Sequence, residues 1–213
     1  MRTGLLVMAK APAPGAVKTR LEPLLGDHGC AELQSRLIRH TVTWAVNAAD
    51  AVSLAYAPVD AGSLLANLVP PEVALFPQRG ENLGARLAAA CADAAGRNRG
   101  PLAVIGTDAP LLGAPHVRSA FASLRAGAGA SLIPALDGGY VLIAMATPDP
   151  AAFDLPVRAW GGPDVLSLTL AALDRAGITV ALLPPVPDLD TPADACALLR
   201  HPGCPPSIQA VLA

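Results

Sequence analysis

Short apolar runs alternate with Ala/Leu-rich amphipathic segments along the chain, and this alternation limits the possible folds more than any other feature. The strand-like runs are GLLVMA, AVSLAYA, VALF, LAVIGT, ASLIPAL, YVLIAMA and TVALLP. Helical periodicity lies between them, near residues 29–48, 61–67, 83–96, 115–126, 163–176 and 192–200. Such alternation predicts a three-layer α/β/α fold around a mostly parallel sheet. A DGGY turn joins two runs without a helix, so we expect a mixed, antiparallel segment late in the sheet.

Composition narrows the class of protein. A length of 213 residues predicts one domain that spans residues 1–213. Apolar residues make up 53% of the chain and aromatic residues only 3%, so the core must consist mainly of Ala, Val and Leu. The net charge of −2 and the few aromatics disfavour nucleic acid as a partner. No apolar run approaches the length of about 18 residues that a membrane span needs, so we expect a cytoplasmic protein with no membrane partner.

Two segments lack clear periodicity. Residues 146–163 are rich in Pro and Gly, which is typical of a mobile loop or lid. The tail after Pro202 is expected to fray.

Both lysines of the chain lie in the loop that follows the first apolar run. This loop reads MAKAPAPGAVKTRL and carries Lys10, Lys18 and Arg20. Cations beside flexible backbone at a strand end are typical of a phosphate site. A basic surface loop is the alternative.

Aspartates follow several later strands, and the carboxyl ends of parallel strands meet at one edge of an α/β sheet. Asp108 comes directly after LAVIGT and lies too far upstream to cap the next helix. Asp188 and Asp190 precede a Thr-Pro-Ala-Asp cap, which accounts for Thr191 but for neither aspartate. A Mg²⁺ ion bound to substrate phosphates takes one or two carboxylates, so we expect Asp108 and Asp190 to share Mg²⁺ or Mn²⁺.

Two further candidates have a structural and a functional explanation. Asp137 and the glycines after it form either a plain hairpin turn or a surface against which a substrate lies. Arg86, at the start of a helix, can reach a phosphate or a base, whereas solvation explains Arg79 and Glu81 equally well. The chain lacks the Walker, GxGxxG, GxSxG and HExxH motifs and has no CxxC pair.

Taken together, six segments resemble one bacterial family. They are MAKAPAPGAVKTRL, ENLGARL, GTDAPLL, DGGYVLI, the Trp-containing residues 160–166, and DLDTPAD. The chain resembles the glycosyltransferases associated with radical-SAM and selenium-domain clusters. These belong to the nucleotide-diphospho-sugar transferase superfamily, which has the glycosyltransferase-A-like fold and includes the molybdopterin and phospholactate guanylyltransferases.

The resemblance implies roles for individual residues. Nucleotide phosphates would contact Lys10, Lys18 and Arg20, and the metal would bind Asp108 and Asp190. The first loop has Pro12 and Pro14 where nucleotidyltransferases are richer in Gly, and Asp108-Ala109-Pro110 stands where classical glycosyltransferases of this fold have DxD. The prolines weaken the case for nucleotidyl transfer, and the missing DxD weakens the case for glycosyl transfer. The reaction type therefore stays open.

The catalytic residues are expected to be Lys18, Asp108 and Asp137, and the donor-binding residues Lys10, Gly15, Lys18, Thr19, Arg20 and Arg86. The first hypothesis is a Mg²⁺-dependent transferase that acts on a nucleotide sugar and a small-molecule acceptor. The alternatives are a nucleotidyltransferase that releases pyrophosphate, and a nucleotide-binding domain without catalysis. The base, the sugar, the acceptor and the oligomeric state stay open.

Overall fold

The apolar runs of the sequence form one seven-stranded sheet in the computed structural model, which describes residues 2–98 and 100–213. The strands are β1 (Gly4–Lys10), β2 (Ala51–Ala57), β3 (Ala74–Pro77), β4 (Leu102–Ile105), β5 (Ala130–Pro134), β6 (Tyr140–Met145) and β7 (Val180–Leu182). Their order in the sheet is β3-β2-β1-β4-β6-β5-β7. The central strands β1 and β4 are almost entirely buried, as expected for strands that are covered on both faces.

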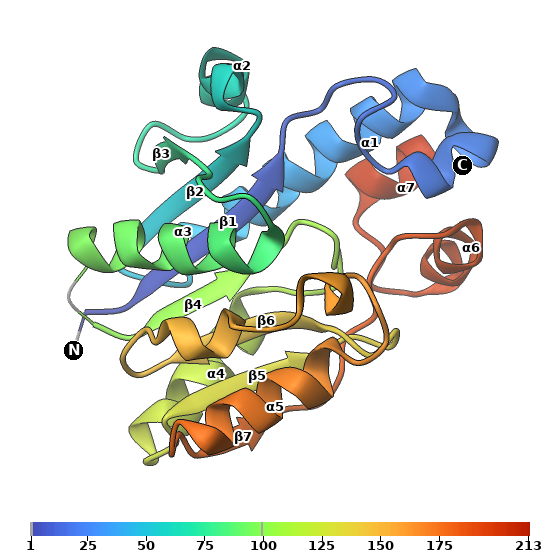
Figure 1. The fold of residues 1–213 in the computed structure, drawn as a ribbon. Coiled ribbons are helices and arrows are strands. Elements are labelled where there is room, and N and C mark those ends of the chain that lie inside the picture. Colours follow the sequence, from blue (N-terminus) through green and yellow to red (C-terminus); the bar gives the residue numbers. More distant parts are fainter. Residues whose placement is uncertain (1, 99) are drawn as a thin grey trace.

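All strands run parallel except β6. It lies between β4 and β5 and pairs antiparallel with both. The hairpin turn between β5 and β6 is the DGGY segment, so the expected antiparallel segment is confirmed. As a result, β6 begins at the edge where β1 and β4 end (Figure 1).

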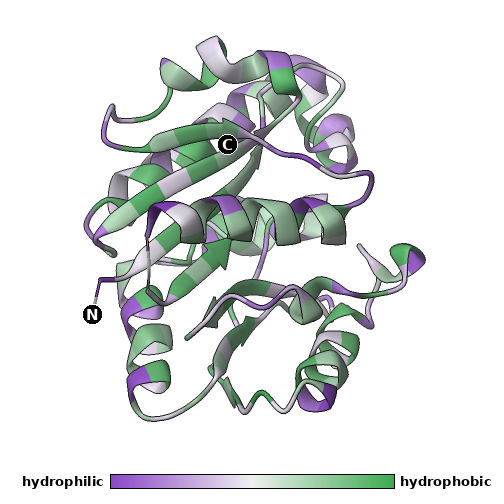
Figure 2. Cartoon of the chain, turned by 60° about the vertical axis from the view of Figure 1, so that its left-hand side comes forward, coloured by the Kyte–Doolittle hydropathy of each residue, from purple (hydrophilic) through white to green (hydrophobic). Residues whose placement is uncertain are grey.

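Helices cover both faces of the sheet, which gives three layers (Figure 1). They are α1 (Glu22–Ala45), α2 (Gly62–Ala66), α3 (Leu83–Arg97), α4 (Ala114–Arg125), α5 (Val165–Arg175), α6 (Pro192–Arg200) and α7 (Pro206–Leu212). Alternate residues of β1 point to opposite faces: Leu5 packs in the core that α1 and α4 cover, and Leu6 in the core that α3 and α5 cover. Figure 2 shows the strands predominantly hydrophobic and the helices banded with polar residues. The predicted fold class is therefore confirmed.

Residues 146–163 differ from the mobile loop that their composition suggested. The segment contains two short 3₁₀ helices, η3 (Pro150–Phe153) and η4 (Val157–Ala159). The Phe153 side chain is 3% exposed and joins the core beneath α3. An apolar anchor thus fixes this segment, although its sequence has neither helical nor strand periodicity.

The tail after Pro202 is also ordered, contrary to expectation. Ile208 and Leu212 of α7 are buried with Leu33 and Leu37 of α1, and this burial of apolar surface holds the tail. No helix in the described part of the chain has the length and apolar character needed to cross a membrane.

Packing of η3 against α3 depends on Gly84. A Cβ atom at this position would lie 2.5 Å from the Phe153 carbonyl oxygen and 3.0 Å from Trp160 Nε1. The same helix contains an exposed glycine, Gly96, whose Cβ would meet nothing within 4 Å. Gly84 therefore has a packing role that Gly96 does not share.

We expect Gly84→Ala to lower the free energy of unfolding by about 1–3 kcal/mol, because the added methyl group overlaps backbone that cannot easily move. Gly96→Ala should instead raise it by up to about 1 kcal/mol, because Ala is the better helix former. Urea denaturation followed by circular dichroism measures both values. Equal stabilisation by the two substitutions would contradict the packing assignment.

Candidate functional site

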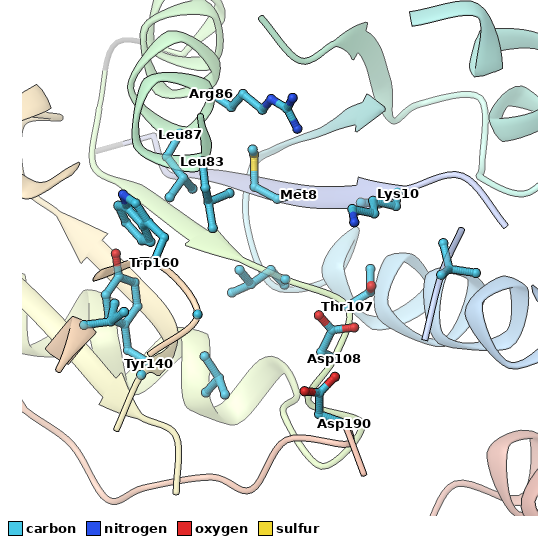
Figure 3. Close-up of a pocket in the computed structure, with 18 of the residues that line it drawn as sticks. Met8, Lys10, Leu83, Arg86, Leu87, Thr107, Asp108, Tyr140, Trp160 and Asp190 are labelled. Carbon is cyan, nitrogen blue, oxygen red and sulfur yellow. The ribbon is translucent and has the colours of Figure 1, made fainter. Parts of the chain in front are cut away.

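A cleft of about 570 Å³ opens at the edge of the sheet where β1 and β4 end and β6 begins. Eight of the nine residues predicted for the site line this cleft: Lys10, Lys18, Thr19, Arg20, Arg86, Asp108, Asp137 and Asp190. Figure 3 shows several of them around the cleft. The ninth, Gly15, lies outside the lining, at an exposed position with φ 70°. Gly15 therefore shapes the loop through its positive φ.

Lys18 is held more tightly than expected for a cation on a flexible loop. Its side chain is only 5% exposed, and its backbone adopts the left-handed conformation, with φ 52°. The Lys18 Nζ lies 2.6 Å from Asp108 Oδ1 and donates a hydrogen bond of 2.6 Å to the Leu189 carbonyl oxygen. The Leu189 N–H in turn donates to the Asp108 carbonyl oxygen at 2.7 Å. Lys18 thus ties together the segments that follow β1, β4 and β7.

A second ion pair lies at the mouth of the cleft. Arg20 Nη1 is 2.6 Å from Asp190 Oδ2, and both side chains are substantially exposed. Asp190 directly precedes the predicted N-cap of α6, Thr191, which forms a capping box with Asp194. Burial alone would raise the pKa of Asp194, but hydrogen bonds from Thr191 outweigh it and lower the pKa. The cap therefore fixes the backbone beside Asp190.

Asp108 and Asp190 suit a divalent cation that is shared with a ligand. Their side chains are 59% and 41% exposed, and each ion pair occupies one carboxylate oxygen. Both carboxylates line the cleft (Figure 3). No group of three or more His, Cys, Asp or Glu residues suited to a metal occurs within the described residues. This set fits Mg²⁺ or Mn²⁺ whose remaining ligands are water and phosphate oxygens.

Asp137 lies in the hairpin turn and also faces the cleft. Its Oδ1 accepts a hydrogen bond of 2.9 Å from the Gly139 N–H, and Gly138 has φ 94°. A smaller hollow of about 150 Å³ adjoins the cleft and is lined by Asp108, Asp137 and Asp188. Asp137 can therefore stabilise the turn and still contact a ligand in the cleft. Burial raises the pKa of the Asp188 carboxyl, and the negative charge of Asp137 raises this pKa further.

Two amides, the buried Gln34 and the half-buried Gln78, organise the site, and neither was assigned a role from the sequence. Gln34 Nε2 of α1 donates to the Lys10 carbonyl oxygen at 3.0 Å and to Thr107 Oγ1 at 3.3 Å. Gln78 Nε2 bonds the carbonyl oxygens of Ala9 and Ala55 at 3.2 and 2.9 Å. Gln34 was detectable, because it is a polar residue on the apolar face of its helix.

Arg86 and a group of apolar residues form the remaining wall. Arg86 Nε donates to the Gly80 carbonyl oxygen at 3.0 Å, which orients the guanidinium at the start of α3. Beside it, the cleft is lined by Met8, Leu83, Leu87, Ile143, Tyr140 and Trp160. Sequence reasoning singled out none of these six as a site residue, since apolar residues there resemble ordinary core positions.

The chain is similar to a protein family and to several solved structures. The profile of a family described as "Uncharacterized protein conserved in bacteria (DUF2064)" matches residues 41–161. No curated protein matches the sequence. A structure from Desulfovibrio desulfuricans G20, named as a candidate nucleotide-diphospho-sugar transferase, is 28% identical with a TM-score of 0.89; the match covers 99% of this chain and 93% of that one.

Two more distant structures share the fold. A nucleotidyl transferase from Methanothermobacter thermautotrophicus is 16% identical with a TM-score of 0.62, over 92% of this chain and 95% of that one. A manganese complex of Rv0371C from Mycobacterium tuberculosis H37Rv is 17% identical with a TM-score of 0.56, over 94% and 99%. These two share the fold, and the Desulfovibrio structure confirms the superfamily expected from the sequence.

The contacts of Lys18 predict a structural effect of its removal. We expect Lys18→Ala to lower the free energy of unfolding by about 2 kcal/mol, because it leaves the Leu189 carbonyl oxygen and Asp108 without their charged donor. Lys10→Ala, in the same loop but at an exposed position, should change it by less than about 0.5 kcal/mol. Urea denaturation distinguishes the two. If Lys18→Ala is as stable as Lys10→Ala, the contacts of Lys18 with Asp108 and Leu189 contribute little to the free energy of unfolding.

The raised pKa of Asp188 predicts a pH dependence. The folded state holds this proton more tightly than the unfolded state, whose pKa is near 3.8, so stability is lost as the pH rises through the raised pKa. Asp188→Asn should therefore increase the melting temperature at pH 7, and the gain should shrink towards about pH 4. Asp60→Asn, at an exposed position in η2 (Val59–Ala61), is the control. A gain independent of pH would contradict this explanation.

Proposed function

The chain belongs to the DUF2064 family, and from this starting point we propose that it is a transferase with a nucleotide-activated donor, specifically a nucleotide-sugar glycosyltransferase that uses Mg²⁺ or Mn²⁺. The observation that carries the proposal is the cleft itself. It places the cationic side chains of Lys10, Arg20 and Arg86 around two exposed aspartates at the carboxyl edge of the sheet. Ligands of open α/β sheets bind at this edge.

The charges of the cleft suit a diphosphate. Lys10 and Arg86 lie on the β1 and α3 side (Figure 3). Arg20 is paired with Asp190. A nucleoside diphosphate carries negative charges that these cations can neutralise, and arginine binds phosphate oxygens in pairs. Thr19 and the backbone shaped by Gly15 complete the phosphate-binding loop in this proposal.

The acids have separate roles. Asp108 and Asp190 would hold the divalent ion, which supplies positive charge next to the departing diphosphate. Lys18 fixes the Asp108 carboxylate through its 2.6 Å ion pair. Asp137, in the hairpin turn, would orient the sugar or the acceptor. Similarity to the Desulfovibrio structure supports the transferase, and the manganese bound by a protein of the same fold supports the use of a divalent ion.

A nucleotidyltransferase is the second candidate. The basic loop after β1 and the shared fold with the Methanothermobacter nucleotidyl transferase favour it. In that reaction a phosphate oxygen of the substrate attacks the α-phosphorus of a nucleoside triphosphate, and the bond to the leaving pyrophosphate breaks. The same cations and aspartates would serve either reaction, so the products distinguish them.

The proposal is tested by thermal-shift measurements with nucleotides and nucleotide sugars, with and without Mg²⁺ or Mn²⁺. A ligand that binds the native state raises the melting temperature in proportion to the logarithm of its concentration above Kd. Metal-dependent stabilisation by a nucleotide sugar supports the glycosyltransferase, and pyrophosphate release from a triphosphate supports the second candidate. Binding with no turnover of any donor would indicate a nucleotide-binding domain without catalysis.

We expect Asp108→Asn to keep the fold and to abolish the part of the ligand-induced melting shift that depends on Mg²⁺. Removing one of two carboxylates weakens a Mg²⁺ site strongly, whereas Asn still offers Lys18 an oxygen acceptor. Asp60→Asn should leave the shift unchanged. Full metal dependence in the Asp108→Asn protein would remove Asp108 from the metal site.

A further inference from the structure

The cleft has two chemically different halves. One half carries the charged groups described above. The other lies over the face of the sheet that α3 and α5 cover, and its walls are Met8, Leu83, Leu87, Ile143, Tyr140 and Trp160. We call these six residues the apolar half. No part of the proposed function uses them.

The apolar half is the edge of the core beneath α3, where Ile143 and Leu87 are buried and Leu83 faces the open cleft. Leu83, the first residue of α3, has 43% of its surface exposed, although large aliphatic side chains are usually buried. In Figure 3 the side chains of Leu83 and Leu87 extend from α3 into the space that Trp160 and Tyr140 border. The ordered segment at residues 146–163 supplies Trp160, and Gly84 allows this segment to lie directly against α3.

The polar atoms of the two aromatic residues do not face the cleft. Trp160 Nε1 and the Tyr140 hydroxyl are both buried. Trp160 Nε1 lies against Gly84. A ligand in this half therefore meets ring surfaces and aliphatic chains. A sugar ring would leave its hydroxyl groups without partners here, which is unfavourable away from water.

We propose that the acceptor of the transfer carries an apolar portion several carbons long, and that this portion binds in the apolar half. The charge distribution supports this assignment, because the donor's phosphates match the cationic half and leave the apolar half for the second substrate. The identification as an acceptor rests on the proposed function. The binding of an apolar group does not.

Trp160 gives a direct measurement of binding. The chain has two tryptophans, so Trp44→Phe leaves Trp160 as the sole fluorophore. Bromine quenches tryptophan fluorescence on contact, and ω-bromoalkanols from 3-bromopropanol to 6-bromohexanol are the probes. We expect saturable quenching, with the half-saturating concentration falling about threefold to fourfold for each added methylene. Linear quenching of equal strength for all chain lengths would overturn the proposal.

Leu83→Asn tests the location. In the Trp44→Phe background it should raise the half-saturating concentration of 6-bromohexanol about fivefold to tenfold, because it removes exposed apolar surface from the wall. The matched control is Leu64→Asn in α2, at a residue 46% exposed that is not part of the cleft. Melting curves establish that both variants fold. No effect of Leu83→Asn, or an equal effect of Leu64→Asn, would overturn the location.

A competition experiment decides whether the apolar portion belongs to the acceptor or to the donor. The quenching by 6-bromohexanol is measured again in the presence of the nucleotide that gives the largest melting shift. Undiminished quenching by 6-bromohexanol in its presence supports an acceptor, whereas displacement would assign the apolar portion to the donor and overturn the proposal. Nucleotide binding without any bromoalkanol binding would overturn the inference and leave the proposed function intact. Bromoalkanol binding without any nucleotide binding would do the reverse: it would remove the transferase assignment but keep an apolar binding site.

Discussion

The arrangement of the site depends on one buried ammonium group. Lys18 Nζ contacts the Asp108 carboxylate and the Leu189 carbonyl oxygen, which lie 90 and 171 residues away along the chain. A buried lysine is stable only when its charge is compensated, so the three segments must come together for the loop after β1 to adopt its conformation. The left-handed backbone of Lys18 is a further sign that tertiary contacts determine this loop.

The two halves of the cleft are built by different means. Ion pairs and a helix cap hold the charged half, and both involve groups that remain accessible to a ligand. Close backbone packing holds the apolar half, where Gly84 allows the segment at residues 146–163 to approach α3. Changes in ionic strength should therefore affect the first half more than the second.

Much of this structure follows from the sequence because its signals are local. Strand and helix periodicity determined the fold class, and the double glycine after Asp137 marked the antiparallel hairpin. The rule that parallel strands end at one edge indicated that Asp108, Asp137 and Asp190 lie together. The contacts of Lys18 with Leu189, the burial of Phe153 and the exposure of Leu83 were not predictable in this way, because each depends on partners remote in the sequence.

The hairpin between β5 and β6 has a consequence for how such a site diverges during evolution. The turn is closed by a hydrogen bond of 3.0 Å between the Ala135 N–H and the Gly139 carbonyl oxygen, and Tyr140 follows at once. Inserting one residue here would shift the register of β6 and move both Tyr140 and Ile143 to the other face of the sheet, away from the core beneath α3. The loop after β1 has no such register to preserve. Length variation among homologues should therefore accumulate in the loop after β1, while the hairpin keeps its length.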